Sequence, residues 1–236
     1  MEEIGKFFIS IIDSFYNTLI VDNRYKYILE GLFNTIIIAF FAVIIGIIIG
    51  IIVALIRDNY DKNKKMPILN FIVKAYVNII RGTPVILQLM IIYYVIFKSV
   101  NINIVVVSIL AFGINSGAYV SEIIRAGINS IAAGQSEAGY ALGFKYREIM
   151  KLVVLPQAIK NILPALGNEF ITLLKETSVG AYIGVVELTK ASDIIASRTY
   201  DYFFPLIIIA CIYLILTLGL SKLMNRLERK LNNVRS

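Results

Sequence analysis

A polar stretch punctuated by glycine lies between two apolar segments, and its sequence QSEAGYALGFKYREIMKLVVLPQ fills residues 135–157. The residues from Ser136 to Leu142 are good helix formers, and serine is a residue type that caps helix N-termini. Gly143 follows at the position where a glycine commonly ends a helix. The pattern therefore predicts a short helix, capped by Ser136, in a structured loop with a function of its own. The alternative is an ordinary connector between two membrane spans.

Polar side chains also recur within the apolar segments, at steps of three or four residues that place them on one helical face. Asn115 and Asn168 fall at similar, near-central depth when about 1.5 Å per residue is counted from each end. A pair of carboxamides can donate to a substrate carboxylate and accept from its ammonium group. We expect the two to face each other across a transport pathway, with interhelical hydrogen bonding as the alternative. The two faces comprise Ser108, Phe112, Asn115, Tyr119 and Glu122, and Gln157, Asn161, Asn168, Thr172 and Lys175.

The candidate pathway includes four more polar residues, Gln88, Ser116, Glu122 and Thr172. Glu122 lies nearer the cytoplasmic side of its span, where a carboxylate would attract a cationic solute along the exit path. The alternative is a helix-surface ion pair with Arg125, which follows three residues later. Both interpretations remain open at this point.

The residue types exclude several kinds of site. The chain has no histidine and one cysteine, Cys211, so an intrachain disulfide and a histidine-based triad are impossible. Metal sites built from histidine and cysteine are not expected either. The chain also lacks a GxxxxGK[ST] phosphate loop, so we do not expect it to hydrolyse ATP by itself or to hold a cofactor.

The composition is that of an all-α integral membrane protein, because 58% of the residues are hydrophobic and the mean hydropathy is +0.77. Residues 33–56 alone form 24 consecutive uncharged positions, more than the roughly 20 needed to cross the hydrocarbon. We expect five spans, at residues 32–56, 84–98, 104–124, 157–176 and 204–224. Residues 68–80 are expected to lie flat at the inner membrane surface before the second span.

Small residues on the first span predict close approach by another helix, since they recur at every fourth position. They are Ala42, Gly46, Gly50 and Ala54.

The distribution of lysine and arginine sets the orientation, because cytoplasmic loops carry an excess of both. The loop after the first span, the polar loop and the C-terminal tail hold most of them: Arg57, Lys62, Lys64, Lys65, Lys145, Arg147, Lys151, Lys222, Arg226, Arg229, Lys230 and Arg235. The N-terminus is therefore expected outside and the C-terminus in the cytoplasm. Residues 1–31 are expected to form an extracytoplasmic segment with a short interfacial helix over residues 4–12, and no cleavable signal peptide is predicted. Residues 32–230 then form the membrane domain, with the polar cytoplasmic loop at 132–156 and a cytoplasmic tail at 231–236.

The polar loop resembles the EAA signature, by which permease subunits of ATP-binding-cassette importers engage their ATPase. That signature reads EAA, three residues, G, nine residues and I-x-LP, and here Gly139 replaces its second alanine and Val153 its isoleucine. Four further segments resemble the importer permeases for histidine, arginine, glutamine, glutamate and opines: RGTPVILQL at 81–89, NSGAYVSEIIRAGI at 115–128, LPALGNEFITLLKETS at 163–178 and GVVELT at 184–189. The resemblance covers essentially residues 30–230.

The resemblance implies the type I importer fold with five transmembrane helices, in the plasma membrane of a prokaryote. The implied function is ATP-driven import of polar L-amino acids of the arginine, histidine, lysine or glutamine type. The implied partners are two cytoplasmic ATPase subunits that bind ATP and Mg, a second permease copy or a paralogue, and an extracytoplasmic binding protein. The implied ATPase-coupling residues are Gln135, Glu137, Ala138, Gly139, Gly143 and Pro156.

Two other classes of function remain as alternatives. An ion-coupled secondary carrier would be expected to show inverted repeats and more spans. A non-transporting membrane assembly subunit or an integral enzyme would have to work with carboxylates, because the usual catalytic groups are absent.

Overall fold

The computed structural model describes residues 12–233, and every regular element within them is a helix. The all-α expectation is thus confirmed for this part of the chain. The interfacial helix expected from residue 4 lies outside the described residues, as does the end of the tail, residues 234–236. The elements are η1 (Val21–Asn23), α2 (Tyr25–Asn63), α3 (Pro67–Gly82), α4 (Val85–Ile91), η2 (Ile92–Ile96), α5 (Ile104–Asn129), α6 (Ala133–Ala141), α7 (Tyr146–Ile149), η3 (Met150–Val154), α8 (Leu155–Glu176), η4 (Thr177–Ile183), α9 (Leu188–Thr199) and α10 (Phe203–Asn233).

Four helical segments of the described chain are long and apolar enough to cross a membrane, and they contain α2, α5, α8 and α10. The second expected span, at residues 84–98, differs from its prediction. The helix α3 contains residues 68–80, which were expected to lie flat at the inner membrane surface. It packs against α2 and α5 and meets the α4–η2 segment at a bend of 112°. The bend falls before Pro84, because proline disfavours helical geometry in the preceding residue, and Thr83 is indeed extended with φ −125° and ψ 148°. The second span is therefore a broken one, if the bent pair crosses the membrane as a unit.

The helices α2 and α5 form the most extensive contact in the fold. All four small residues of the predicted ridge on α2 are buried. A Cβ atom added at Gly46 would lie 2.7 Å from Ser116 Oγ, and one at Gly50 would lie 2.5 Å from Val120 Cγ1. A glycine of α5 also lies in close contact with α2, because a Cβ atom at Gly117 would lie 2.7 Å from Ile49 Cγ2. The predicted close approach is confirmed.

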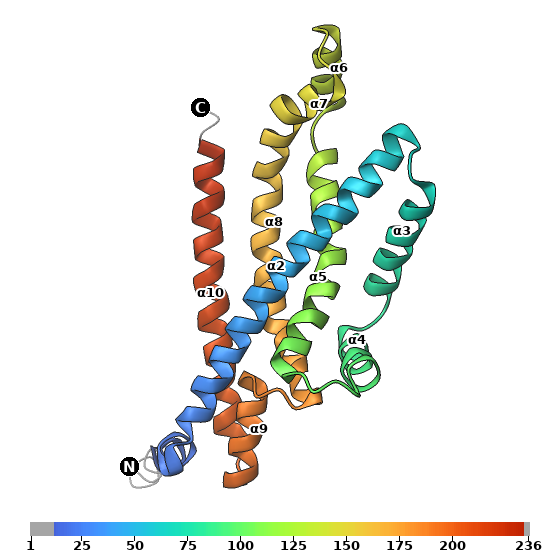
Figure 1. Ribbon diagram of the computed structural model, residues 1–236. Helices are drawn as coiled ribbons and strands as arrows, with labels where there is room; N and C mark the ends of the chain where they lie inside the picture. The colour runs from blue at the N-terminus through green and yellow to red at the C-terminus, as the bar shows by residue number, and fades with distance from the viewer. Residues whose placement is uncertain (1–11, 234–236) are drawn as a thin grey trace.

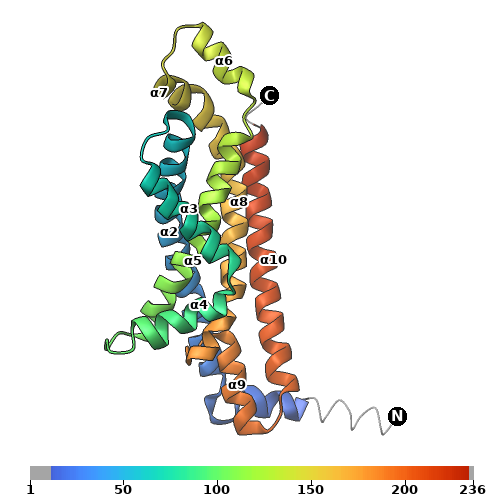
Figure 2. The same cartoon turned by 90° about the vertical axis from the view of Figure 1, so that its right-hand side faces the viewer.

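The long axis of the molecule separates two groups of elements (Figure 1). The helices α6 and α7 lie at one end, together with the C-terminal end of α10, while α9 and η1 lie at the other. Figure 2 shows the same separation from the side, with α6 standing beyond the ends of the long helices. The arrangement is the one that an outside N-terminus and a cytoplasmic C-terminus require, and the orientation itself remains a prediction.

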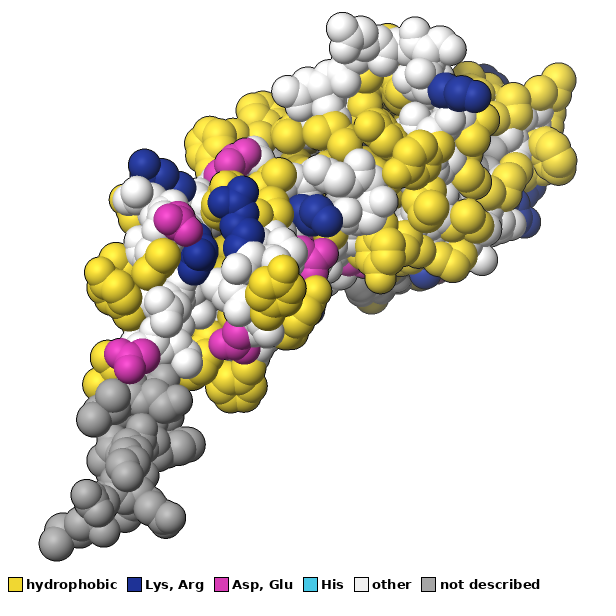
Figure 3. All heavy atoms as spheres, turned by 90° about the horizontal axis from the view of Figure 1, so that it is seen from below, with side chains coloured by type: hydrophobic (Ala, Val, Ile, Leu, Met, Phe, Trp, Pro, Cys, Tyr) yellow, Lys and Arg dark blue, Asp and Glu magenta, His cyan; other side chains and the backbone are white. Residues whose placement is uncertain are grey.

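The end that carries α9 is ordered by polar contacts. The Glu187 carboxylate caps α9 by accepting hydrogen bonds from the backbone N–H groups of Thr189 and Lys190, at 2.7 Å each. The Lys190 ammonium also lies 3.5 Å from the Asp193 carboxylate. Seen from this end, basic and acidic side chains lie among exposed hydrophobic ones (Figure 3). This mixed surface is suited to a membrane boundary, where apolar and charged groups meet.

Candidate coupling and transport sites

The short helix expected in the polar loop is present as α6, with one correction to its start. The helix begins after Ala132, so Ser136 lies inside it and the predicted serine cap is wrong. Helix formation reaches further upstream because Ala133 and Gln135 also tolerate helical geometry. The end is as predicted, since Gly143 adopts φ +85°, a left-handed conformation that other residues rarely take.

One face of α6 packs against the segment that follows it, and the predicted coupling residues lie on the exposed part of the helix. Gly139 is buried, and a Cβ atom at that position would lie 2.8 Å from Ile149 Cγ1. The coupling residues Gln135, Glu137 and Ala138 are exposed. The glycine that departs from the EAA signature therefore allows α6 to sit close to the segment that follows it.

Exposed apolar side chains accompany the end of α6. Tyr140 is 54% exposed and Leu142 is 76% exposed, although both are large hydrophobic residues. Exposed apolar groups on a short helix outside the span bundle mark a surface that another protein can cover. The last predicted coupling residue, Pro156, is the second residue of α8, directly after η3.

The centre of the bundle holds two polar pairs that join different helices. The Asn115 carboxamide on α5 donates a hydrogen bond of 2.8 Å to Gln88 Oε1 on α4. The neighbouring Ser116 hydroxyl donates one of 2.8 Å to Glu169 Oε1 on α8. Asn115 is 3% exposed and Ser116 is fully buried. Two of the predicted pathway residues, Gln88 and Asn115, are thus brought together, and a third, Ser116, pairs with Glu169.

Gln88 also fixes the bend between α3 and α4. Its side-chain amide donates to the carbonyl oxygen of Ile80 at 2.8 Å and to Thr83 Oγ1 at 2.7 Å. The carboxamide oxygen of Gln88 remains as the acceptor for Asn115. The bend is thus tied directly to the polar centre, by which we mean Gln88, Asn115, Ser116 and Glu169.

Glu169 is the residue that the sequence interpretation missed. The polar face predicted on its span ran through Asn168 and Thr172 at helical steps and passed over the position between them. A signal was available, because an ionisable residue inside an apolar span is costly and marks a functional position by default. Its hydrogen bond with Ser116 shows that the carboxylate faces α5.

Two of the predicted residues on α8 lie elsewhere. Asn168 and Thr172 are exposed, and the carboxamide of Asn115 contacts Gln88 instead of Asn168. On α5, Phe112 belongs to the hydrophobic core formed with Ile38, Leu89 and Leu173. The expected pairing of the two asparagines across the pathway is therefore not found, because Gln88 of α4 is the partner of Asn115.

The charged residues at the other end of α5 pair with α2. Arg57 contacts Glu122, and the Arg125 guanidinium lies 3.0 Å from Asp61 Oδ2. Glu122 and Arg125 thus each have a partner on the neighbouring helix, in place of the pair within α5 that was one of the two interpretations. Because Glu122 is engaged by a cation of the protein itself, the structure favours a role in joining two helices.

A helical bundle with membrane-spanning segments, a polar centre and a docking helix beyond its end defines the class of a membrane transport subunit. Comparison with known proteins agrees. Residues 46–233 match the family described as binding-protein-dependent transport system inner membrane component. The chain belongs to this family.

Individual relatives are similar over most of their length. A protein named putative glutamine transport system permease protein, from Rickettsia typhi, is 41% identical over 207 residues, which cover 87% of this chain and 93% of the relative. The arginine transport system permease protein of Bacillus subtilis is 42% identical over 209 residues, covering 88% and 93%. The crystal structure of an amino acid ABC transporter with histidines superposes with a TM-score of 0.82 at 42% identity, covering 89% of this chain and 96% of the other.

Proposed function

We propose that the chain is the permease subunit of an ATP-binding-cassette importer that carries polar L-amino acids, of the arginine, histidine, lysine or glutamine type, into the cytoplasm. Two partner ATPase subunits would bind and hydrolyse ATP with Mg, and a second permease copy would complete the pathway. An extracytoplasmic binding protein would deliver the substrate. The named relatives support the substrate class, since they are described as glutamine and arginine permeases.

The observation that carries the proposal is the position of α6. It stands beyond the ends of the long helices, presents Glu137 and Ala138 to solvent and ends in the exposed side chains of Tyr140 and Leu142. The chain has no phosphate loop, so its energy source must reach it through a contact. A short exposed helix at the basic end of the molecule provides that contact.

The polar centre is the proposed transport path. Glu169 offers a negative charge to a substrate ammonium or guanidinium group, while Asn115 and Gln88 offer both donors and acceptors. Ser116 orients the carboxylate. In alternating access the substrate is held near the middle of the membrane, and the three helices that supply these groups then move relative to one another.

The test is uptake by the complex reconstituted in proteoliposomes with its ATPase and binding protein. Radiolabelled arginine, histidine and glutamine should accumulate only with ATP, and the loaded binding protein should stimulate ATP hydrolysis. Glu137→Lys should release the ATPase from purified complexes while leaving the membrane helices folded, because the substitution reverses a charge on the exposed face of α6.

Two outcomes would contradict the proposal. Uptake that follows an ion gradient without ATP would identify a secondary carrier. An assembled complex in which no amino acid is transported and ATP hydrolysis is unaffected by the binding protein would identify a non-transporting assembly subunit.

A further inference from the structure

The docking helix α6 reaches the rest of the molecule chiefly through the segment that follows it, α7 and η3. Gly139 lies against Ile149 of α7, and the backbone N–H of Phe144 donates to the Gly139 carbonyl oxygen at 3.1 Å. The backbone N–H of Lys145 is in turn held by Glu148 Oε2 at 2.7 Å. A displacement of α6 by a partner therefore carries α7 with it.

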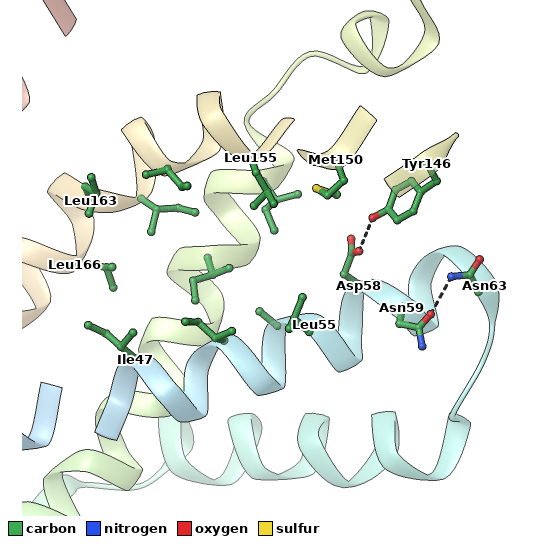
Figure 4. A pocket seen from close by; sticks show the side chains of 16 residues that line it. Ile47, Leu55, Asp58, Asn59, Asn63, Tyr146, Met150, Leu155, Leu163 and Leu166 are labelled. Carbon is green, nitrogen blue, oxygen red and sulfur yellow. Dashed lines mark hydrogen bonds between the residues drawn. The ribbon is translucent and has the colours of Figure 1, made fainter. Parts of the chain in front are cut away.

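Tyr146, the first residue of α7, joins this segment to the end of α2. Its hydroxyl donates a hydrogen bond of 2.7 Å to Asp58 Oδ2 and accepts one of 2.5 Å from the Lys62 ammonium. The same ammonium lies 4.4 Å from the centre of the Tyr146 ring and 2.6 Å from Asp58 Oδ1. We call Tyr146, Asp58 and Lys62 the α7 clamp. Figure 4 shows Tyr146 pointing from α7 to Asp58 on α2, at the rim of an apolar groove of about 550 Å³.

The end of α2 is joined to α5 by a separate pair of contacts. Arg57 and Asp61 bind Glu122 and Arg125, as described above. Residues 57 and 61 lie one helical turn apart, and so do residues 58 and 62. The last turns of α2 thus hold α5 with one pair of side chains and α7 with the adjacent pair.

We propose that Tyr146 is a positioning residue that transmits movement of the docking helix to α2 and α5 during transport. The inference rests on the proposed function, since it requires an ATPase that moves α6. The α7 clamp is suited to this role because a hydroxyl shared between a carboxylate and an ammonium makes charge-assisted hydrogen bonds, which are stronger and more directional than neutral ones. Without the clamp, α7 can move while α2 stays in place.

The first variant is Tyr146→Phe, which keeps the ring and its contact with Lys62 and removes only the hydroxyl. Tyr60→Phe is the matched control, because Tyr60 lies on the same end of α2 and its ring faces Lys64 at 5.2 Å. Both variants are assembled with the ATPase and the binding protein. The readouts are retention of the ATPase, ATP hydrolysis with and without loaded binding protein, and amino acid transported per ATP.

For Tyr146→Phe we expect the ATPase to remain bound and unstimulated hydrolysis to stay within about twofold, since α6 is unchanged. Transport per ATP should fall about tenfold or more, the effect expected when a hydrogen bond to a charged group is lost in the transmitting step. Tyr60→Phe should match the wild type. A lost structural contact would lower the amount of complex instead, without changing the ratio of transport to hydrolysis in what remains.

Asp58→Asn and the double variant with Tyr146→Phe separate the clamp from general stability. If both act through one contact, the double variant should transport per ATP about as well as the worse single variant. Three outcomes would each overturn the inference. In the first, the losses of the two single variants multiply in the double variant. In the second or third, Tyr146→Phe leaves transport per ATP unchanged or only lowers the amount of assembled complex. Absence of stimulated hydrolysis in the wild-type complex would overturn the proposed function itself, so the two failures are distinguishable.

Discussion

Glu169 places a carboxylate among the apolar side chains of α8, and its known partner is the hydroxyl of Ser116. A neutral hydrogen-bond donor does not balance the charge of a carboxylate in an apolar span. A cationic substrate group would supply that balance while bound. The residue therefore has the chemistry to distinguish arginine or lysine from glutamine.

Glu169→Gln should reduce uptake of arginine and lysine by about tenfold or more and uptake of glutamine by much less. The variant keeps the shape and an acceptor for Ser116 but loses the charge, and a hydrogen bond to a charged group contributes about 1.5–3 kcal/mol. Competition between labelled arginine and glutamine in proteoliposomes measures the change. Glu122→Gln is the comparison, because that carboxylate already contacts Arg57. A larger selectivity change in Glu122→Gln would move the cation site to the end of α5.

Glu187 is a second carboxylate with an unusual setting, in the segment between α8 and α10. Burial raises the pKa of Glu187 to about 7, although hydrogen bonds from Thr189, Lys190 and Tyr213 oppose the shift. The native state thus binds a proton more tightly than the unfolded chain, in which the pKa is about 4.3. The associated stability is fully present below the unfolded pKa and is lost as the pH rises through 7.

Thermal unfolding of the purified protein should therefore occur at a lower temperature at pH 8 than at pH 5.5, by on the order of 5 °C. The absence of histidine leaves few other side chains that titrate in this range. Glu187→Gln should flatten the dependence on pH, even if losing part of the α9 cap lowers the unfolding temperature at every pH. A Glu187→Gln protein with the same slope as the wild type would assign the dependence to other groups.

At the scale of elements, the close packing of α2 and α5 depends on four glycines, each of which lies against a side chain of the other helix. They are Gly46 and Gly50 on α2 and Gly113 and Gly117 on α5. The sequence predicted half of this contact, the small-residue ridge on α2, because spacing along one helix is visible in a single chain. It did not identify the partner helix, since Gly113 and Gly117 of α5 carry no sign of where they dock. The same limit applied to the broken second span: Pro84 marked a helix start, but the direction of the bend is set by packing of α3 on its neighbours.

The substitution Gly50→Ala should lower the unfolding temperature of the protein, because the added methyl group would lie 2.5 Å from Val120 Cγ1. Overpacking of this kind costs about 1–3 kcal/mol. The matched control is Gly219→Ala on α10, where a Cβ atom meets nothing within 4 Å. Alanine there should be neutral or stabilising by up to about 1 kcal/mol. Equal effects of the two substitutions on unfolding in detergent would contradict the close α2–α5 contact.

The sequence predicted the helix α6 more accurately than the polar centre, for a physical reason. The coupling helix is a local feature, so its glycine stop and exposed face follow from short-range chemistry, and only its first residue was misplaced. The polar centre is assembled from three helices, and helical periodicity cannot tell which polar side chain on each will meet another. Asn115 was found in this way, while Glu169 was passed over for its neighbour Asn168.

At the scale of the whole molecule, the orientation in the membrane can be measured directly. In a Cys211→Ala chain, a cysteine at Asn63 should react with an impermeant thiol reagent from the cytoplasmic side only, and a cysteine at Asn101 from the outside only. Both residues are exposed, so reagent access is governed by the side of the membrane. Labelling of the two positions from the same side would also show that α3, α4 and η2 do not cross as one broken span. Reversed labelling would place α6 away from ATP.

The length of α2 has a consequence for the lipid around the protein. The helix has 39 residues, and its apolar part over residues 33–56 is about 36 Å long at 1.5 Å per residue, against roughly 30 Å of hydrocarbon. Such a helix must tilt, and Figure 1 shows it crossing α8 and α5 obliquely. A thicker bilayer would lower the tilt and a thinner one would increase it. Since the end of α2 carries Asp58 and Lys62, bilayer thickness is expected to alter how efficiently this protein converts ATP hydrolysis into uptake.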